Sequence, residues 1–252
     1  MKKLLHATPG ANLMLLIIFA CFACTKEKVL AIPSITNTTY IDTSRGGNNS
    51  AKTDLSYLAL GDSYTIGQSV AENDRFPAQT VELLKSKNIT VKSTTYIATT
   101  GWTTGNLINA INAQNPDHNY DIVTLLIGVN DQYQHVDIDT YRNHFTALLN
   151  TAVTLAGNRP SRVFVISIPD YSATPFVGQQ DKARVSKEID DFNAANKDIT
   201  LSNKIAYIDI TTGSREAATN STLIAGDGLH PSGKEYAKWA ALLTPVIQAA
   251  LK

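Results

Sequence analysis

Ser63 is the first residue in this sequence whose type and setting could support chemistry. It lies in Gly61-Asp62-Ser63, directly after an apolar run that suits a strand and before a segment that can open a helix. The first backbone N–H groups of a helix have no partner inside it, so they can face an oxygen held beside the side chain. The same position also favours a serine that only caps the helix. Ser63 alone therefore leaves both interpretations open.

His230 is the second candidate, and it lies in a loop punctuated by glycines, Gly226-Asp227-Gly228-Leu229-His230. Asp227 precedes the histidine by three residues and can turn back to hold its imidazole, which would fix the tautomer and stabilise the imidazolium. The alternative is a capped helix start with a surface histidine. Among rival bases, His144 lies inside a predicted helix, and His118 and His135 lie in polar loops without an aspartate at this spacing.

Two further segments could bind a developing negative charge. In Thr100-Gly101-Trp102, the glycine would let a ligand approach the backbone closely, and Gly101 could donate its N–H to an oxyanion. In Gly128-Val129-Asn130-Asp131-Gln132, Asn130 carries the neutral NH₂ donor that an oxyanion hole needs. An ordinary turn glycine and an Asx turn are the alternatives. Spacing alone does not decide which residue of 130–132 faces the site.

Each of these segments follows a predicted strand. Apolar runs predict strands at 57–60, 91–98, 122–127, 163–168 and 205–210. Amphipathic segments predict helices at 77–87, 104–114, 138–156, 186–198 and 231–251, with Pro231 in the first turn of the last helix. Alternating strands and helices indicate an α/β fold with a parallel sheet covered on both faces. In such sheets, ligands bind beyond the carboxyl ends of the strands.

Together, the four segments resemble the signature blocks of the SGNH/GDSL hydrolases, in family order and over essentially all of the chain from Tyr57 onward. The likeness is greatest to the single-domain bacterial esterases and lysophospholipase-like enzymes. This resemblance implies a flavodoxin-like three-layer α/β/α sandwich with a five-stranded parallel sheet in the order 2-1-3-4-5. It implies that Ser63 is the nucleophile, His230 its base and Asp227 the residue that orients the base. It also implies an oxyanion hole built from the N–H groups of Ser63 and Gly101 and the side chain of Asn130.

The substrate is less constrained by these residues. Trp102 departs from the usual small residue of the second block and is expected to crowd or floor the pocket, beside Tyr64 and Tyr133 and with Tyr171 or Phe176 nearby. Mostly polar strand-end loops favour a short acyl group on a hydrophilic alcohol, such as an acetylated carbohydrate, because little apolar surface is evident. The alternatives are a lysophospholipase or thioesterase, and a non-catalytic carbohydrate-binding protein on the same fold.

The N-terminal residues predict export. Lys2 and Lys3 precede a short apolar stretch that ends in small residues and cysteine, which is typical of a secretory signal. This pattern resembles a bacterial lipoprotein signal over 1–23 with Cys24 as the acylated residue, and Cys21 as the alternative. A tether rich in Thr, Ser, Asn and Gly follows over 24–54, and the hydrolase domain is expected at 55–252. The sequence therefore predicts an exported protein held at a membrane through a lipid anchor.

Composition limits the remaining possibilities. Lys plus Arg and Asp plus Glu both number 22, so there is no overall basic charge to recruit nucleic acid. Both cysteines lie in the predicted signal segment, so the domain is expected to hold no disulfide, cysteine nucleophile or cysteine metal site. The chemistry expected of Ser63 and His230 needs no metal and no organic cofactor. The oligomeric state is left open by the sequence.

Overall fold

The computed structural model describes residues 54–252. The predicted signal 1–23, Cys24 and all but the last residue of the predicted tether lie outside them. Five parallel strands form one sheet in the order β2-β1-β3-β4-β5. The strands are β1 (Leu55–Gly61), β2 (Val91–Ala98), β3 (Ile122–Leu126), β4 (Val163–Ile166) and β5 (Ala206–Ile208).

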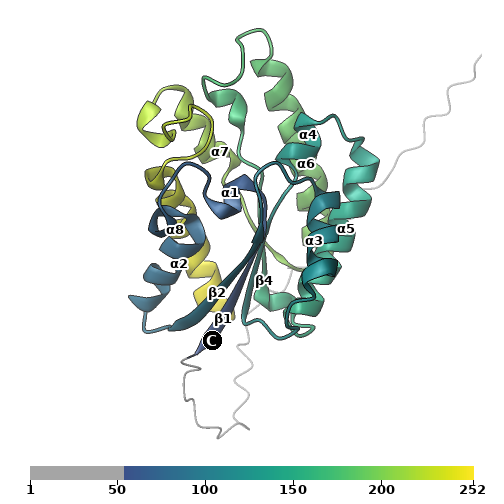
Figure 1. The fold of residues 1–252 in the computed structure, drawn as a ribbon, viewed down its shortest axis with the longest axis vertical. Coiled ribbons are helices and arrows are strands. Elements are labelled where there is room, and N and C mark those ends of the chain that lie inside the picture. The colour runs from purple at the N-terminus through teal and green to yellow at the C-terminus, as the bar shows by residue number, and fades with distance from the viewer. Residues whose placement is uncertain (1–53) are drawn as a thin grey trace, which may run out of the picture. The chain divides into compact units, whose positions relative to one another are not determined.

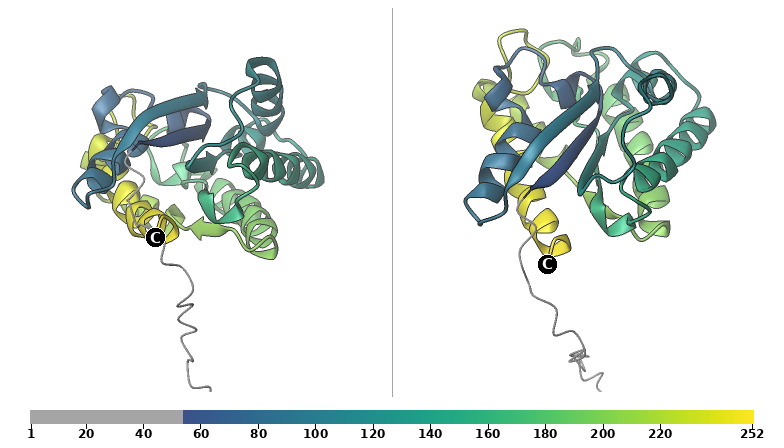
Figure 2. Two further views of the ribbon diagram at one scale, coloured as in Figure 1. Left: turned by 90° about the horizontal axis from the view of Figure 1, so that it is seen from below. Right: turned by 60° about the horizontal axis from the view of Figure 1, so that its bottom comes forward.

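Helices cover both faces of this sheet (Figures 1 and 2). On one face, α2 (Phe76–Lys85) packs against α8 (Gly233–Ala250). On the other face, α5 (Ile138–Leu155) packs between α3 (Thr104–Gln114) and α6 (Lys182–Ser202). The predicted three-layer α/β/α fold and its strand order are therefore confirmed. The shorter helices are α1 (Ser63–Ile66), α4 (Val129–Tyr133) and α7 (Thr211–Ser214), with 3₁₀ turns at Glu72–Asp74, Pro160–Arg162, Tyr171–Ala173, Arg215–Ala218 and Ser221–Leu223.

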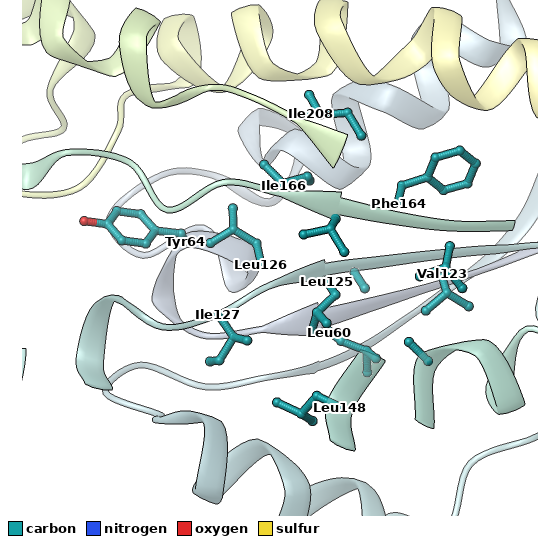
Figure 3. Close-up of a cluster of buried hydrophobic side chains, with 14 of the residues drawn as sticks. Leu60, Tyr64, Val123, Leu125, Leu126, Ile127, Leu148, Phe164, Ile166 and Ile208 are labelled. Carbon is teal, nitrogen blue, oxygen red and sulfur yellow. The ribbon is translucent and has the colours of Figure 1, made fainter. Parts of the chain in front are cut away.

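The core lies between the sheet and its two helical layers. Every residue of β3 and β4 is buried, as expected of strands that are covered on both faces. Figure 3 shows the apolar side chains of these strands meeting Leu60 from β1, Ile208 from β5 and Leu148 from α5. Tyr57 is buried in the same core, and its hydroxyl forms a hydrogen bond of 3.1 Å with Thr124 Oγ1.

Several predicted boundaries were wrong. The structure ends β3 at Leu126 and β4 at Ile166, each earlier than predicted, and α6 extends beyond 186–198 at both ends. Pro231 lies outside α8, because the Ser232 side chain accepts a hydrogen bond from the Glu235 N–H and begins the helix there. Pro231 instead pairs with Ile224 in an isolated antiparallel bridge.

The register of the sheet aligns the ends of the three strands that matter for the site. Gly61 pairs with Ala98 of β2 on one side and with Leu126 of β3 on the other. Ser63, Gly101 and Asn130 follow these three residues by only a few positions. The loops that carry them therefore leave the same edge of the sheet side by side.

Within residues 54–252, no helix is both long and apolar enough to cross a membrane.

Candidate active site

Ser63 is the first residue of α1 and is not its cap. Asp62 takes the cap position, where its Oδ1 accepts a hydrogen bond of 2.9 Å from the Tyr64 N–H. The turn from β1 into α1 is tight, since a Cβ on Gly61 would lie 2.1 Å from Thr65 Oγ1 and 2.4 Å from the Leu126 carbonyl oxygen. Within the described residues, the Ser63 hydroxyl makes no hydrogen bond. It is thus left available for chemistry.

Asp227 and His230 meet as the sequence predicted. The bridge between Ile224 and Pro231, together with a hydrogen bond of 2.7 Å from the Ala225 N–H to the His230 carbonyl, closes a loop with Asp227 at its tip. Asp227 Oδ2 lies 2.6 Å from His230 Nδ1. A carboxylate at Nδ1 holds the proton there and leaves Nε2 as the basic nitrogen of the neutral ring.

Four donors surround the Asp227 carboxylate. Oδ1 accepts the backbone N–H groups of Leu229 at 3.0 Å and His230 at 2.9 Å, and Oδ2 accepts the Ser69 hydroxyl at 2.6 Å besides the imidazole. Partial burial of this carboxyl raises its pKa, but the hydrogen bonds from Ser69, the two N–H groups and the imidazole outweigh burial and hold the pKa of Asp227 well below its usual range. Asp227 therefore stays ionised beside the imidazole.

Ser63 and His230 line one pocket but are not hydrogen-bonded to each other in the described structure. Both side chains are largely buried, with 4% and 8% of the residue exposed. In enzymes without substrate, the bond between a nucleophile and its base is often long and tightens only in the complex. The arrangement is compatible with proton transfer on this basis.

Three donor groups could face an oxyanion in this pocket. Neither the Ser63 N–H nor the Gly101 N–H has an acceptor among residues 54–252, and both residues line the pocket with Asn130. The Gly101 backbone has φ 84°, a left-handed conformation that glycine adopts without strain. Asn130 Nδ2 donates one hydrogen to the Trp102 carbonyl at 3.0 Å, which orients the amide and leaves its second hydrogen free.

The structure also decides which residue of 130–132 faces the site. Asn130 lines the pocket, whereas Asp131 is fully buried and accepts a hydrogen bond of 2.9 Å from the Thr104 N–H. Gln132 is buried too, and its Oε1 accepts a hydrogen bond of 2.8 Å from the Tyr171 hydroxyl. Of the three consecutive polar residues, only Asn130 lines the pocket that contains Ser63 and His230.

The pocket has a volume of about 170 Å³. Tyr64 and Tyr133 line it as predicted, with Tyr171 and Phe176. The Tyr64 ring also contacts His230 edge-on, with the ring centroids 5.6 Å apart. The remaining lining residues are Ser63, Thr100, Gly101, Val129, Asn130, Leu229 and His230.

Trp102 does not take the predicted position. Its ring is partly buried against the hydrophobic core and is not among the residues that line the pocket. It contributes its backbone carbonyl instead, as the acceptor for Asn130. The residue that departs most from the usual second block is thus accommodated outside the pocket.

Comparison with known proteins identifies the family. A model of the GDSL-like lipase/acylhydrolase family matches residues 59–238. The chain belongs to this family. A comparison with curated proteins by sequence finds no match.

Solved structures share the GDSL fold with this chain at low identity. A psychrotrophic esterase, EstA from Pseudoalteromonas sp., solved with monoethylphosphonate as inhibitor, is 16% identical with a TM-score of 0.60, over 78% of this chain and 98% of its own. A lipase from a goat rumen metagenome is 20% identical with a TM-score of 0.61, over 76% and 97% of the two chains. A lipase/acylhydrolase from Enterococcus faecalis is 17% identical with a TM-score of 0.60, over 79% and 97%.

Membership of the GDSL family places the chain among serine-dependent acyl hydrolases. Several residues around its site could not be found from the sequence. Leu229 lies inside the fourth block, but no pattern marks it as a pocket residue. Ser69 carries no signal at all, because its partner Asp227 is 158 positions away.

Proposed function

We propose that this protein is a carboxylic ester hydrolase that works through an acyl-enzyme on Ser63. The contact that carries the proposal is the 2.6 Å approach of Asp227 Oδ2 to His230 Nδ1. It leaves Nε2 as the proton acceptor in the pocket that also contains Ser63. In this role Asp227 holds and stabilises the base without itself being protonated.

The reaction then proceeds in two balanced halves. Ser63 Oγ attacks the ester carbonyl carbon while its proton passes to His230 Nε2, and the carbonyl oxygen becomes an oxyanion. The oxyanion accepts hydrogen bonds from the N–H groups of Ser63 and Gly101 and from Asn130 Nδ2. Collapse breaks the bond to the alcohol, which takes the proton from His230. Water next gives a proton to His230 and attacks the acyl group, and collapse returns that proton to Ser63.

The pocket volume favours a short acyl group. A closed cavity of about 150 Å³ holds one benzene ring, so the open pocket of about 170 Å³ can surround only a short acyl group, and a longer chain would extend past Tyr133 and Phe176. The sequence predicted a mostly polar rim, but the half-exposed rings of Tyr133 and Phe176 lie there. We propose esters from acetyl to butyryl as preferred substrates, with acetylated carbohydrate as the natural class.

Two measurements test the proposal. Ser63→Ala should lower the hydrolysis of p-nitrophenyl acetate by several orders of magnitude while the fold persists, and a fluorophosphonate should label the parent protein at Ser63 only. A folded Ser63→Ala variant with near-parental activity would remove Ser63 from the mechanism. In a C2 to C12 ester series, a maximum of kcat/KM at C8 or longer would instead favour the lysophospholipase alternative.

We further propose that the protein is exported and anchored to a membrane through an acylated Cys24. The support is the sequence pattern of residues 1–24 alone. The parent protein should partition with membranes, and Cys24→Ser should release it or block its processing. Cys21→Ser is the matched control and should leave partitioning unchanged. A parent protein recovered wholly in the soluble fraction with an unmodified N-terminus would contradict the anchor.

A further inference from the structure

A second cavity adjoins the candidate catalytic pocket. It has a volume of about 280 Å³ and shares Tyr133, Tyr171 and Phe176 with that pocket. Its other walls come from two separate parts of the chain, namely residues around Gln132 and His135 and the segment that leads into α6. A ligand whose ester carbonyl lies at Ser63 can therefore extend past the three rings into this second space.

The three shared rings form one cluster. Their centroids lie 6.5 Å apart for Tyr133 and Tyr171, 6.2 Å for Tyr133 and Phe176, and 6.3 Å for Tyr171 and Phe176. Tyr171 is buried at the base of the cluster, whereas 56% of Tyr133 and 51% of Phe176 are exposed. Tyr133 and Phe176 therefore present exposed, flat apolar faces to a ligand that extends from one cavity into the other.

Hydrogen bonds form a polar array that connects Tyr171, Gln132, Arg184 and Asp181, which line the second cavity, with Glu188, which does not line it. The Tyr171 hydroxyl donates to Gln132 Oε1 at 2.8 Å, and Gln132 Nε2 donates to Glu188 Oε2 at 2.6 Å. Arg184 donates to both oxygens of Glu188 at 3.1 Å and to Asp181 Oδ1 at 3.1 Å. The array holds its polar groups in place before any ligand arrives.

The charges of this array do not suit an anionic ligand. Arg184 is the only cationic Lys or Arg side chain among the lining residues in the described structure, and it is already paired with Asp181 and Glu188. Because Arg184 is already paired with Asp181 in the lining and with Glu188 behind it, the described lining offers no unpaired Lys or Arg side chain to bind a phosphate or carboxylate group. Neutral hydroxyl groups fit better, because they can donate to the Asp181 carboxylate and accept from Gln132 or His135.

We propose that this second cavity binds the sugar portion of an acylated carbohydrate, with the sugar ring against Tyr133 and Phe176 and its hydroxyls on the polar array. The inference rests on the proposed ester hydrolase function and names the alcohol side of its substrate. An acyl chain is a poor occupant, because it would bury Asp181, Arg184 and His135 without replacing their hydrogen bonds to water. The acyl group therefore belongs in the smaller pocket beside Ser63.

The first test compares two acetyl esters that differ only in the alcohol. A monoacetylated disaccharide should be hydrolysed with kcat/KM at least about tenfold higher than ethyl acetate, since each well-placed hydrogen bond to a charged group contributes about a tenfold factor or more. The corresponding unacetylated disaccharide should inhibit competitively. Hydrolysis of ethyl acetate without any such advantage would overturn the sugar site but leave the esterase intact, whereas failure to hydrolyse either ester would overturn the proposed function itself.

The second test uses variants that line only the second cavity. The double variant His135→Ala/Asp181→Ala should raise KM for the disaccharide ester about tenfold with kcat little changed, because it removes contacts made equally in the ground and transition states. Its kcat/KM for ethyl acetate should stay within about twofold of the parent value. Asp191→Ala is the matched control, because it removes a carboxylate of an ion pair on α6 that does not line the cavity.

Two outcomes would contradict the sugar assignment. Equal loss on both esters in the double variant would mean that these residues support the fold and not an alcohol site. Competitive inhibition by glycerophosphocholine without inhibition by the disaccharide would assign the cavity to a zwitterionic lipid headgroup, whose choline cation can also bind exposed rings near a carboxylate. Binding of the disaccharide ester to the Ser63→Ala variant, measured by calorimetry, separates recognition from turnover.

Discussion

Ser69 Oγ donates a hydrogen bond of 2.6 Å to Asp227 Oδ2, the same oxygen that faces His230 Nδ1. The loop after α1 and the loop before α8 are thereby joined at the carboxylate that contacts the proposed base, His230. Ser69 adopts φ 65°, a left-handed conformation that is uncommon outside glycine and asparagine. Ser69, whose hydroxyl holds the Asp227 carboxylate, therefore has a strained backbone conformation.

Ser69→Ala should lower kcat by about three- to tenfold, with KM little changed, because one hydrogen bond contributes about 0.5–1.5 kcal/mol. Because His230 acts as base in both halves of the proposed reaction, acylation and deacylation should both slow, which single-turnover and steady-state kinetics can measure separately. Ser69→Gly is the matched control, since it removes the same hydroxyl but relieves the left-handed strain. Should Ser69→Gly regain parental kcat, backbone strain and not the hydroxyl would explain the effect.

Asn130→Ala should lower kcat by a factor of about 100–1000, because removal of one oxyanion donor costs about 2.7–4 kcal/mol of transition-state stabilisation. Labelling by a fluorophosphonate should slow in parallel, since the phosphoryl oxygen occupies the same place. The variant also loses the hydrogen bond to the Trp102 carbonyl. Thermal unfolding is therefore measured beside kcat, and a stable variant with parental kcat would exclude Asn130 from the oxyanion hole.

The kcat/KM of Gly101 variants should depend on how well the new residue tolerates a left-handed backbone, and not on the size of its side chain. A Cβ at this position would meet nothing within 4 Å, so the penalty comes from φ 84° alone. Left-handed backbone costs ordinary residues about 1–2 kcal/mol but is better tolerated by asparagine. Gly101→Asn should keep more kcat/KM than Gly101→Val, whose branched Cβ is least compatible with this conformation. Equal activities of these two variants would show that the backbone here is not constrained.

Asp62 should make the stability of the protein depend on pH. Complete burial raises the pKa of this carboxyl to about 8, and the negative charge of Asp131 adds to the rise, although the Tyr64 N–H opposes it. The ordinary value is 3.8, so between about pH 4 and pH 8 the folded state holds a proton that the unfolded chain has already released. The stabilisation is complete below this window and declines as the pH rises through it.

Asp62→Asn should remove that part of the decline, because the amide carries no proton to lose. Urea unfolding at pH 5 and pH 8 measures the difference, with Asp139→Asn on the exposed first turn of α5 as the control. Asp62 Oδ2 has no hydrogen-bond partner in the described structure, which adds to the penalty of ionising it. If parent and variant lose the same stability between the two pH values, Asp62 is not protonated in the fold.

The sequence was most informative where residues close together in the chain act together. Asp227 and His230 are three positions apart and meet as predicted, because a short loop constrains their geometry. Ser63, Gly101 and Asn130 line one pocket because each follows a strand of one parallel sheet, whose carboxyl ends share an edge.

Contacts between distant segments could not be predicted in this way. The orientation of Trp102 depends on whether its ring packs on the core or in the pocket, and the pattern Thr100-Gly101-Trp102 fits both. The start of α8 was misplaced because Pro231 suits a first helical turn, whereas the Ser232 side chain provides the stronger cap. The hydrogen bond between Gln132 of α4 and Glu188 of α6 joins residues 56 positions apart, and no sequence spacing connects them.

The turn at Gly157-Asn158 divides the site into two sets of residues. Asn158 is exposed and has φ 57°, between the end of α5 and the beginning of β4. The proposed nucleophile and all three proposed oxyanion donors precede this turn, and the aspartate and histidine of the proposed triad follow it. If the backbone were cut at this turn, each of the two fragments would contain only part of the proposed site and would be inactive alone. Turnover would return only when β3 and β4 pair again, so the enzyme could serve as a split reporter of association.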